Sequence, residues 1–426
     1  QSVLRLCKHG GVPSRYDAVV VGAGPAGSVA ALVLARGGLR VALVDKASFP
    51  RDKACGDLVG PRGVQLLDEL GIDVTGPRVG DMQVVGPTGR QVLLRAFPGV
   101  TYPGFGFVLP RLYFDAQLRK AALDAGAEGL TGRADEPRFD ESGELIGFRL
   151  ASGLEVCADV VIGADGALTR VGQAAGLVDE RRVLWGFAIR GYVDAMPDLP
   201  QIMFWEPSTW AGYPGYGWLF PGLDGIANIG LGVGVRGDRR EGARAARDLD
   251  AFVKTVVGDS AVRARLGGWL KMGMVGTIPA RGRTLLVGDA AGLVNSLQGE
   301  GIAQAIGSGR AAADAVLTAG PSGAADQYRA ALRSLYAPYA ARTAPLTAAM
   351  LGRPRVVAGV GRLLTAPGLG RLLSGGWAVY WNDLLEGASS GWPRRTAAVA
   401  HAVAGLSTTG TRDRRDVMAS LEASTS

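Results

Sequence analysis

The chain has 426 residues, 47% of them hydrophobic, and a formal net charge of +7 in which arginines far outnumber lysines. This length exceeds what one compact core usually spans, so we expect two or three domains. The arginines are scattered, without interleaved aromatic residues or zinc-type spacing, which argues against nucleic-acid binding and leaves acidic partners (pyrophosphate groups or anionic lipid) or a coding bias as explanations.

The stretch from residue 17 to residue 45 is the most informative in the chain. The sequence Asp17-Ala-Val-Val-Val-Gly-Ala-Gly-Pro-Ala-Gly27 precedes an apolar, helix-like segment and then Val41-Ala-Leu-Val-Asp45. This pattern predicts a strand, a Gly-x-Gly-x-x-Gly turn, a helix and a second strand that ends in an acid. That order is what a dinucleotide-binding site needs.

Each residue of this pattern has a physical reason to be there. Gly22 permits the tight turn, Gly24 leaves room for a pyrophosphate to approach the backbone, and Gly27 lets the helix lie close to the strand. The helix N-terminus offers N–H groups and a partial positive charge to the phosphates. Asp45 would accept hydrogen bonds from a ribose. The alternatives are an ordinary glycine-rich turn and a solvated acid at a strand end.

Further along the chain, helix-like and strand-like segments alternate. Apolar spacing predicts helices over 61–70, 111–125 and 249–266, and alternation predicts a hairpin over 82–94 and strands over 156–162 and 185–235. The strand over 156–162 leads into Gly163-Ala-Asp165-Gly166. Nucleotide-type features therefore occur in separate blocks, with strand-rich inserts between them.

A second acid-bearing motif is Leu285-Leu-Val-Gly288-Asp289-Ala-Ala-Gly292, which reads as a buried strand that delivers an acid at its carboxyl end. Ligands of open α/β sheets bind beyond such ends. Asp289 could hold the ribityl hydroxyls of a flavin, or it could simply cap a helix. A strong helix over 299–317 begins near Gly299-Glu-Gly-Ile302, and its N-terminus could face the flavin ring and stabilise a reduced, anionic form.

These patterns predict an α/β fold: a Rossmann-like FAD-binding domain with a β-sheet-rich substrate domain inserted and a helical C-terminal region. We expect the FAD-binding domain to be discontinuous, over 16–80, 108–182 and 272–320, and the substrate domain to cover 81–107 and 183–271. The remaining segments are a helical region over 321–410 and flexible termini over 1–15 and 411–426. The arginine-bearing segment 355–382 could lie on a bilayer or pack against the protein.

The chain resembles a known family. Gly22-x-Gly-x-x-Gly27, Gly163-Ala-Asp-Gly166 and Gly288-Asp289 are similar to the three flavin signatures of the para-hydroxybenzoate hydroxylase superfamily. Pro50-Arg-Asp-Lys-Ala-Cys55-Gly-Asp57, and Tyr216-Gly-Trp218-Leu-Phe220-Pro221 followed by Gly230-Leu-Gly232, resemble motifs of the geranylgeranyl reductases. The resemblance covers residues 16 to 320 and implies noncovalent FAD that passes hydride to an isoprenoid double bond.

The resemblance also implies roles for individual residues. Arg111 and Asp165 would contact or support FAD, and Cys55 and Gly56 would lie near its ring. Residues expected around FAD are Gly22, Gly24, Pro25, Ala26, Gly27, Asp45, Lys46, Lys53, Ala54, Cys55, Gly56, Arg111, Asp165, Gly166, Gly288, Asp289, Gly299, Gly301 and Ile302. We expect Tyr216, Trp218, Phe220 and Pro221 to bind the substrate.

The residues themselves give partial support for this assignment. Alternate positions of a strand face one side, so Tyr216, Trp218 and Phe220 would form an apolar wall, unless they belong to an ordinary core strand. Cys55, Tyr216 and Trp218 are the expected catalytic residues, and Cys55, Tyr216 or an ordered water could supply the proton that follows the hydride. The nearby Lys53 could lower the pKa of the Cys55 thiol; otherwise Cys55 is a small buried residue.

Partners and location follow less directly. No second dinucleotide fingerprint appears, so electrons would come from transiently bound NAD(P)H or from a redox protein. The three cysteines and two histidines match no metal site or disulfide framework, so we expect no metal and a cytoplasmic protein, either free or peripheral to the inner face of the membrane. No run of 18 apolar residues exists. The sequence leaves the oligomeric state open, and an FAD-dependent monooxygenase of an apolar natural product is the alternative function.

Overall fold

A computed structural model describes residues 14–94, 104–204, 215–236, 242–351, 353–370, 373 and 392–422. The expected flexible segment 1–15 lies almost wholly outside these residues. The predicted βαβ unit is confirmed: β1 (Ser14–Val21) leads through the glycine-rich turn into α1 (Pro25–Arg36) and then into β2 (Val41–Asp45), which pairs with β1 in parallel.

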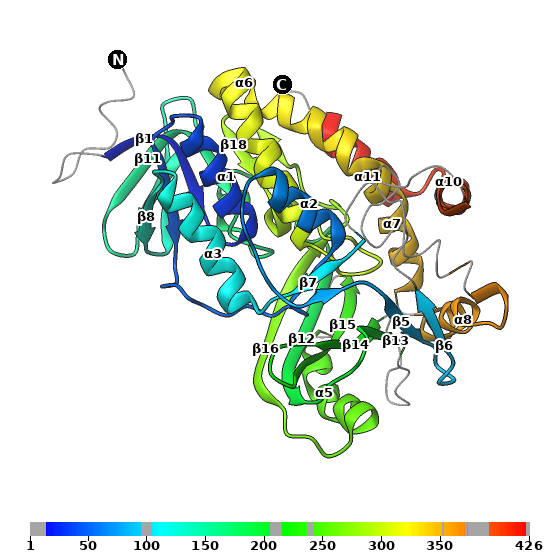
Figure 1. Cartoon of the computed structure of the whole chain (residues 1–426). Helices are drawn as coiled ribbons and strands as arrows, with labels where there is room; N and C mark the ends of the chain where they lie inside the picture. The colour runs from blue at the N-terminus through cyan, green and yellow to red at the C-terminus, as the bar shows by residue number, and fades with distance from the viewer. Residues whose placement is uncertain are drawn as a thin grey trace.

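The first sheet has eight strands, and its main path runs β17-β18-β11-β1-β2-β8. Its remaining strands, β9 and β10, form an antiparallel extension on β11. Helices α1 and α3 (Arg111–Asp124) lie across one face of it, and α6 packs beside α1 (Figure 1). The strand bounds are β8 Glu128–Thr131, β9 Ala134–Phe139, β10 Leu145–Leu150, β11 Glu155–Gly163, β17 Ala280–Arg281 and β18 Thr284–Leu286.

The second sheet has seven strands in the order β16-β12-β15-β14-β13-β5-β6 and lies below the first in Figure 1. It joins the hairpin of β5 and β6 to strands that come more than a hundred residues later, and α5 (Gly242–Val257) packs on it. The bounds are β5 Met82–Val85, β6 Gln91–Leu94, β12 Leu184–Asp194, β13 Gln201–Met203, β14 Gly215–Pro221, β15 Ile226–Arg236 and β16 Arg263–Met272.

The predicted helix over 249–266 is wrong in its second half. The helix α5 ends at Val257, and Gly258, with φ +75°, follows it. The chain then enters β16, which pairs with β12 along most of its length. Pairing with β12 therefore determines the structure of β16, whereas the apolar spacing of residues 249–266 had suggested one continuous helix.

Short elements join the two sheets. The strands β3 (Leu58–Val59) and β4 (Arg78–Val79) flank β7 (Gly106–Val108) in a three-stranded sheet, and α2 (Pro61–Glu69) follows β3. The first acid-bearing motif lies between β11 and the short helix α4 (Arg170–Ala174), and the second lies in the 3₁₀ turn η3 (Gly288–Ala291) after β18.

The described residues of the C-terminal region form the helices α6 (Ile302–Leu335), α7 (Ala337–Met350), α8 (Pro354–Leu364), α10 (Trp392–Ser407) and α11 (Arg412–Glu422). Residues 411–422 differ from the expected flexible tail. Within them, α11 packs on α7 and α6, and its Val417 and Leu421 are buried in the main core. The sequence of this short, charged helix suggested a solvated segment. However, two apolar residues four positions apart lie on the same helix face and are enough to pack it against the core. The predicted fold class, a Rossmann-like α/β domain with a β-rich insertion, is confirmed.

Candidate functional site

The glycine-rich turn between β1 and α1 has little spare space on one side and open space on the other. A Cβ on Gly27 would lie 1.8 Å from the Gly22 carbonyl oxygen, and one on Gly22, where φ is +105°, would lie 2.3 Å from the Ala164 oxygen. A Cβ on Gly24 would meet only an Arg51 nitrogen at 3.6 Å. The turn therefore packs against the protein through Gly22 and Gly27 and keeps the Gly24 side free for a ligand.

Asp45 ends β2 directly beside this turn. One carboxylate oxygen accepts a hydrogen bond from the Ala23 N–H at 2.7 Å, and the other accepts one from the Ala47 N–H at 2.9 Å. A carboxylate has about four acceptor positions, so a ribose hydroxyl could still bind there. The neighbouring Lys46 is exposed.

The structure brings the second acid motif to the same turn. A Cβ on Gly288 would lie 3.1 Å from Ala26, which places η3 against the start of α1. Asp289 lies 3.6 Å from the Lys53 ammonium, and a Cβ on Gly301, the N-cap of α6, would lie 3.6 Å from an Asp289 carboxylate oxygen. The N-termini of α1 and α6 thus converge on one place from segments nearly three hundred residues apart.

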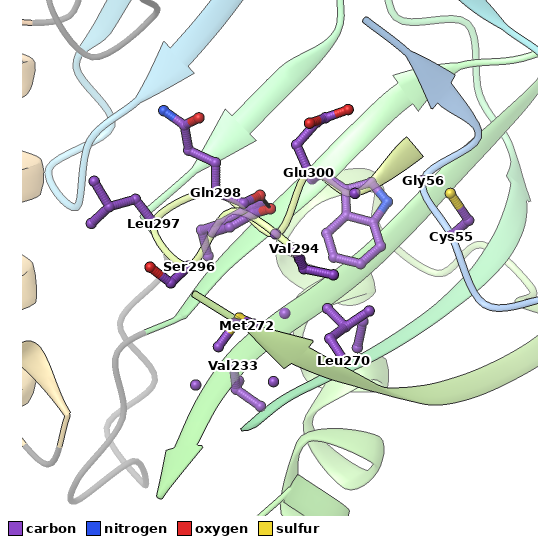
Figure 2. A pocket seen from close by; sticks show the side chains of 18 of the residues that line it. Cys55, Gly56, Val233, Leu270, Met272, Val294, Ser296, Leu297, Gln298 and Glu300 are labelled. Carbon is purple, nitrogen blue, oxygen red and sulfur yellow. Dashed lines mark hydrogen bonds between the residues drawn. The ribbon is translucent and has the colours of Figure 1, made fainter. Parts of the chain in front are cut away.

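A cavity opens from this point, lined by residues from the start of α1, the second sheet and the C-terminal helices. Figure 2 shows Cys55 and Gly56 on one side of it, Ser296 and Leu297 on the other, and Leu270 and Met272 on the strand that crosses beneath. Many of the expected site residues line it: Pro25, Lys53, Ala54, Cys55, Gly56, Arg111, Tyr216, Trp218, Phe220, Asp289, Gly299, Gly301 and Ile302.

The remaining expected residues do not line the cavity. Gly22, Gly24, Ala26 and Gly27 form the turn at its edge, and Gly288 supports η3. Gly166 follows β11, and Pro221 ends β14. Asp165 lies before α4, whose N-cap is Thr169, and one of its oxygens accepts hydrogen bonds from the N–H groups of Arg170 (2.6 Å) and Val171 (3.2 Å). Asp289 lies inside the first turn of η3, whose N-cap is Val287.

Charged groups are paired at the end of the cavity near the turn. Arg111 holds Asp115 with two hydrogen bonds, of 2.6 and 2.8 Å, and Arg51 donates a third at 2.6 Å. Burial disfavours the Asp115 charge, but these guanidinium groups keep the pKa of its carboxyl below the ordinary value. A bidentate pair of this kind fixes the Arg111 side chain in one geometry.

Of the two alternatives for Cys55, the structure favours the buried thiol over the thiol whose pKa is lowered by Lys53. Burial raises the pKa of its thiol above the ordinary value, and the charge of Asp57 raises it further, while the Arg111 charge opposes both. The thiol therefore keeps its proton at neutral pH. Such a group is suited to donating a proton, and is a poor nucleophile.

The expected aromatic wall of Tyr216, Trp218 and Phe220 is present, and glycines on the neighbouring strand β15 leave room for its rings. Tyr216 and Trp218 have ring centroids 6.2 Å apart, and Trp218 and Phe220 are stacked at 6.3 Å. Trp218 pairs with Gly230 across the strands β14 and β15, and a Cβ on Gly230 would lie 2.2 Å from its ring. The Tyr216 hydroxyl donates to the Gln298 carbonyl oxygen. The glycines thus let the indole lie flat against the sheet.

A buried network, which the sequence analysis missed, ties this wall to the Cys55 segment. The Trp218 indole N–H donates to the Asn228 side-chain oxygen at 2.9 Å. The Asn228 amide donates to the Cys55 carbonyl oxygen and to Asp57, both at 2.8 Å. Tyr192 also donates to Asp57, at 2.6 Å. The one signal in the sequence was the position of Asn228, two residues before Gly230 and therefore on the same strand face.

Lys271 on β16 was also missed. Its side chain is fully buried, and its Nζ has no hydrogen-bond partner within the described residues. Burial lowers its pKa to about 8, although Asp165, Asp289 and Glu180 oppose the shift. One Asp165 carboxylate oxygen is also buried and has no hydrogen-bond partner among the described residues. A cofactor with phosphate and hydroxyl groups offers acceptors and donors to both.

The far end of the cavity is built by the C-terminal helices. Thr347 and Met350 of α7 and Val357 and Val360 of α8 line it, together with Phe204 at the end of β13. No sequence motif pointed to these residues, because their role depends on how remote helices pack. In the described part of the chain, no set of three or more His, Cys, Asp or Glu side chains is arranged to hold a metal ion, and no helix is long and apolar enough to cross a bilayer.

Comparison with known proteins agrees with this geometry. Residues 15–333 match the FAD binding domain family. A menaquinone reductase of Mycobacterium tuberculosis is 37% identical over 319 residues, which is 71% of this chain and 77% of the relative. A digeranylgeranylglycerophospholipid reductase of Methanopyrus kandleri is 34% identical over 319 residues, which is 70% of this chain and 76% of the relative.

Solved structures give the same result. A geranylgeranyl bacteriochlorophyll reductase-like protein of Thermoplasma acidophilum superposes with a TM-score of 0.68 at 25% identity, over 84% of this chain and 94% of that one. A flavin-dependent brominase has the same TM-score at 17% identity, over 92% of this chain and 99% of that one, a likeness of fold alone. The bound cofactor is therefore FAD, and the residues at the converging helix N-termini fit it.

Proposed function

Because this chain belongs to the geranylgeranyl reductase family of FAD-dependent oxidoreductases, we propose that it reduces carbon–carbon double bonds of a polyprenyl substrate. The observation that carries the proposal is the continuous cavity. It begins at Asp289 and Cys55 and extends along Tyr216, Trp218 and Phe220 to aliphatic residues of α7 and α8. An isoprenoid chain offers no hydrogen bonds, so such a wall would bind it through apolar contact alone.

The proposal assigns residues to the cofactor. Gly24 and the N-terminus of α1 would bind the pyrophosphate, with Arg51 close by, and Asp45 would bind the ribose. Asp289 would accept hydrogen bonds from the ribityl chain, and the N-terminus of α6 at Gly301 would face the ring. When reduced, bound FAD supplies the hydride. The electrons would come from NAD(P)H or from a redox partner protein.

The reaction needs a proton as well as a hydride. The hydride adds to one alkene carbon and the proton to the other, so the product carries two more hydrogens and a single bond. We assign the proton to the Cys55 thiol, which lines the cavity and stays protonated because burial raises its pKa. Arg111 would stabilise the thiolate that remains, and solvent would return the proton. Tyr216 is the less suitable proton donor, because its hydroxyl already donates a hydrogen bond to the Gln298 carbonyl oxygen.

Product mass tests the proposal. The FAD-loaded protein is reduced with dithionite without oxygen and given a geranylgeranyl lipid or a menaquinone, and the product is then exposed to air. Reduction of a prenyl chain leaves a gain of two hydrogens that survives air, whereas reduction of a quinone ring is reversed. A gain of one oxygen in the presence of O₂ would instead support the monooxygenase, and no substrate-dependent reoxidation would contradict both.

A substitution at Cys55 tests the assigned proton donor. We expect Cys55→Ala to retain FAD and to be bleached normally, but to reoxidise with prenyl substrate at least about tenfold more slowly, since general acid catalysis contributes about 10²–10⁴-fold. Wild-type turnover should fall as the pH rises through the raised pKa of Cys55. Cys55→Ser is the matched control of similar size. Unchanged turnover in Cys55→Ala would remove this residue from the chemistry.

A further inference from the structure

The helix α8 has two different faces. Its inner residues Val357 and Val360 line the cavity, and Leu364 packs against Val84 and Phe204. Its outer residues include Val356 and Leu363, which are 45% and 51% exposed. An apolar side chain on the outside of a helix whose inside is already packed needs a separate explanation.

The second helix of this region repeats the pattern. On α10, Val399, Val403 and Leu406 follow one another at helical spacing and are 62%, 60% and 79% exposed. Leu369, five residues after the end of α8, is 49% exposed. Of the twelve large apolar side chains exposed by the described residues, six lie between Val356 and Leu406. Figure 1 shows α8 and α10 on the same side of the molecule, away from β1 and β11.

The described charged side chains of these two helices have one sign. Residues 353–370 contain three arginines and no acid, and Arg395 near the start of α10 is also exposed. Arg353, Arg355 and Arg362 are exposed next to the outer apolar residues of α8, and none forms an ion pair with another described residue. An arginine near a bilayer surface is attracted to anionic headgroups, while neighbouring aliphatic side chains enter the acyl boundary.

We propose that the outer faces of α8 and α10 form a docking surface for an anionic lipid bilayer. A second copy of this chain fits the surface less well, because a symmetric contact would place arginines opposite arginines. The inner face of α8 lines the cavity, so docking would place the cavity next to the bilayer. Entry of an isoprenoid from the membrane past α8 rests on the proposed function; the docking itself does not.

The test uses the FAD-loaded full chain and vesicles of phosphatidylcholine, with or without phosphatidylglycerol. We expect co-sedimentation with the anionic vesicles at low salt and much less at high salt or with phosphatidylcholine alone. Val356→Glu/Leu363→Glu should reduce binding at least about tenfold, because two apolar contacts are lost and two like charges are added. Arg355→Gln/Arg362→Gln should reduce it about 25-fold, or about fivefold per arginine.

Matched controls carry the same changes elsewhere. Leu154→Glu/Met196→Glu alters two other exposed apolar residues, and Arg133→Gln/Arg181→Gln removes two other exposed arginines. Both should bind vesicles like the wild type. Flavin content and circular dichroism establish that each variant is folded, and reoxidation by a detergent-dissolved prenyl lipid reports the proposed function separately.

Three results would overturn the docking surface. These are no binding of the wild type to anionic vesicles, equal loss of binding in the α8 and control variants, or a wild-type dimer that ignores vesicles and that Val356→Glu/Leu363→Glu dissociates. The last result would assign the surface to a second copy. Vesicle binding without any prenyl turnover would support the docking surface and contradict the proposed function.

Discussion

The two ends of the cavity are held together by different forces. Near the glycine-rich turn, charged groups are paired: Arg111 and Arg51 with Asp115, and Lys53 beside Asp289. Beyond it, the Trp218 ring lies on Gly230, and aliphatic residues from α7 and α8 close the far end. The first end offers charged partners to the phosphates and hydroxyls of FAD. The second offers only apolar contact, as the proposed prenyl substrate requires.

The largest expected effect is on stability, and it comes from substitutions in the glycine-rich turn between β1 and α1. Two of its glycines should differ, one affecting packing and the other FAD binding. Gly27→Ala places a Cβ 1.8 Å from a backbone oxygen, and we expect it to lower the free energy of unfolding of the apoprotein by about 3 kcal/mol or more. Gly24→Ala has room for its methyl group and should change that free energy by less than about 0.5 kcal/mol, yet lose most of the bound FAD. Urea unfolding and flavin absorbance measure the two effects. Equal stability of both variants would contradict the packing role of Gly27.

The two ends also differ in how far the sequence predicts them. The cofactor end depends on local motifs, in which glycine spacing and strand-end acids have one physical meaning, so the sequence could point to Gly27, Asp289 and Gly301, which the structure brings close together. The far end depends on tertiary packing. Val357 and Thr347 belong to helices without a motif, and the pairing of β16 with β12 overrode a helix-like window. Burial, which decides the pKa of Cys55, is also invisible in a sequence.

A smaller effect should appear in the pH dependence of stability. Lys271 has a folded-state pKa of about 8, against an ordinary value of 10.5. Between these values the unfolded chain binds a proton that the folded chain does not, so the free energy of unfolding should rise with pH from about 8 to 10.5. Below pH 8 the full penalty, up to about 3 kcal/mol, is present.

The variant Lys271→Met should remove this slope in the apoprotein and raise its stability at pH 7. Tyrosines and Cys55 with raised pKa values give the opposite slope at high pH, so the comparison is the difference between variant and wild type, measured by urea unfolding. If FAD provides an acceptor for the ammonium, adding FAD to the wild type should flatten the slope. A slope that is the same in both proteins would show that Lys271 is better solvated than its burial indicates.

The smallest effect compares the two ends directly. Asp289→Ala removes a carboxylate that would accept hydrogen bonds from buried ribityl hydroxyls, and we expect FAD binding to weaken by about 1–3 kcal/mol. Trp218→Phe keeps an aromatic ring but removes the N–H that Asn228 accepts, so turnover should fall while FAD content stays normal. Equilibrium dialysis of FAD and the rate of substrate-dependent reoxidation provide the two measurements. If saturating FAD restores turnover in Asp289→Ala but not in Trp218→Phe, cofactor retention and substrate positioning are separable functions of the two ends. If Trp218→Phe instead loses FAD as readily as Asp289→Ala, the indole belongs to the cofactor site, and the apolar wall begins further along the cavity, at Phe220 and α8.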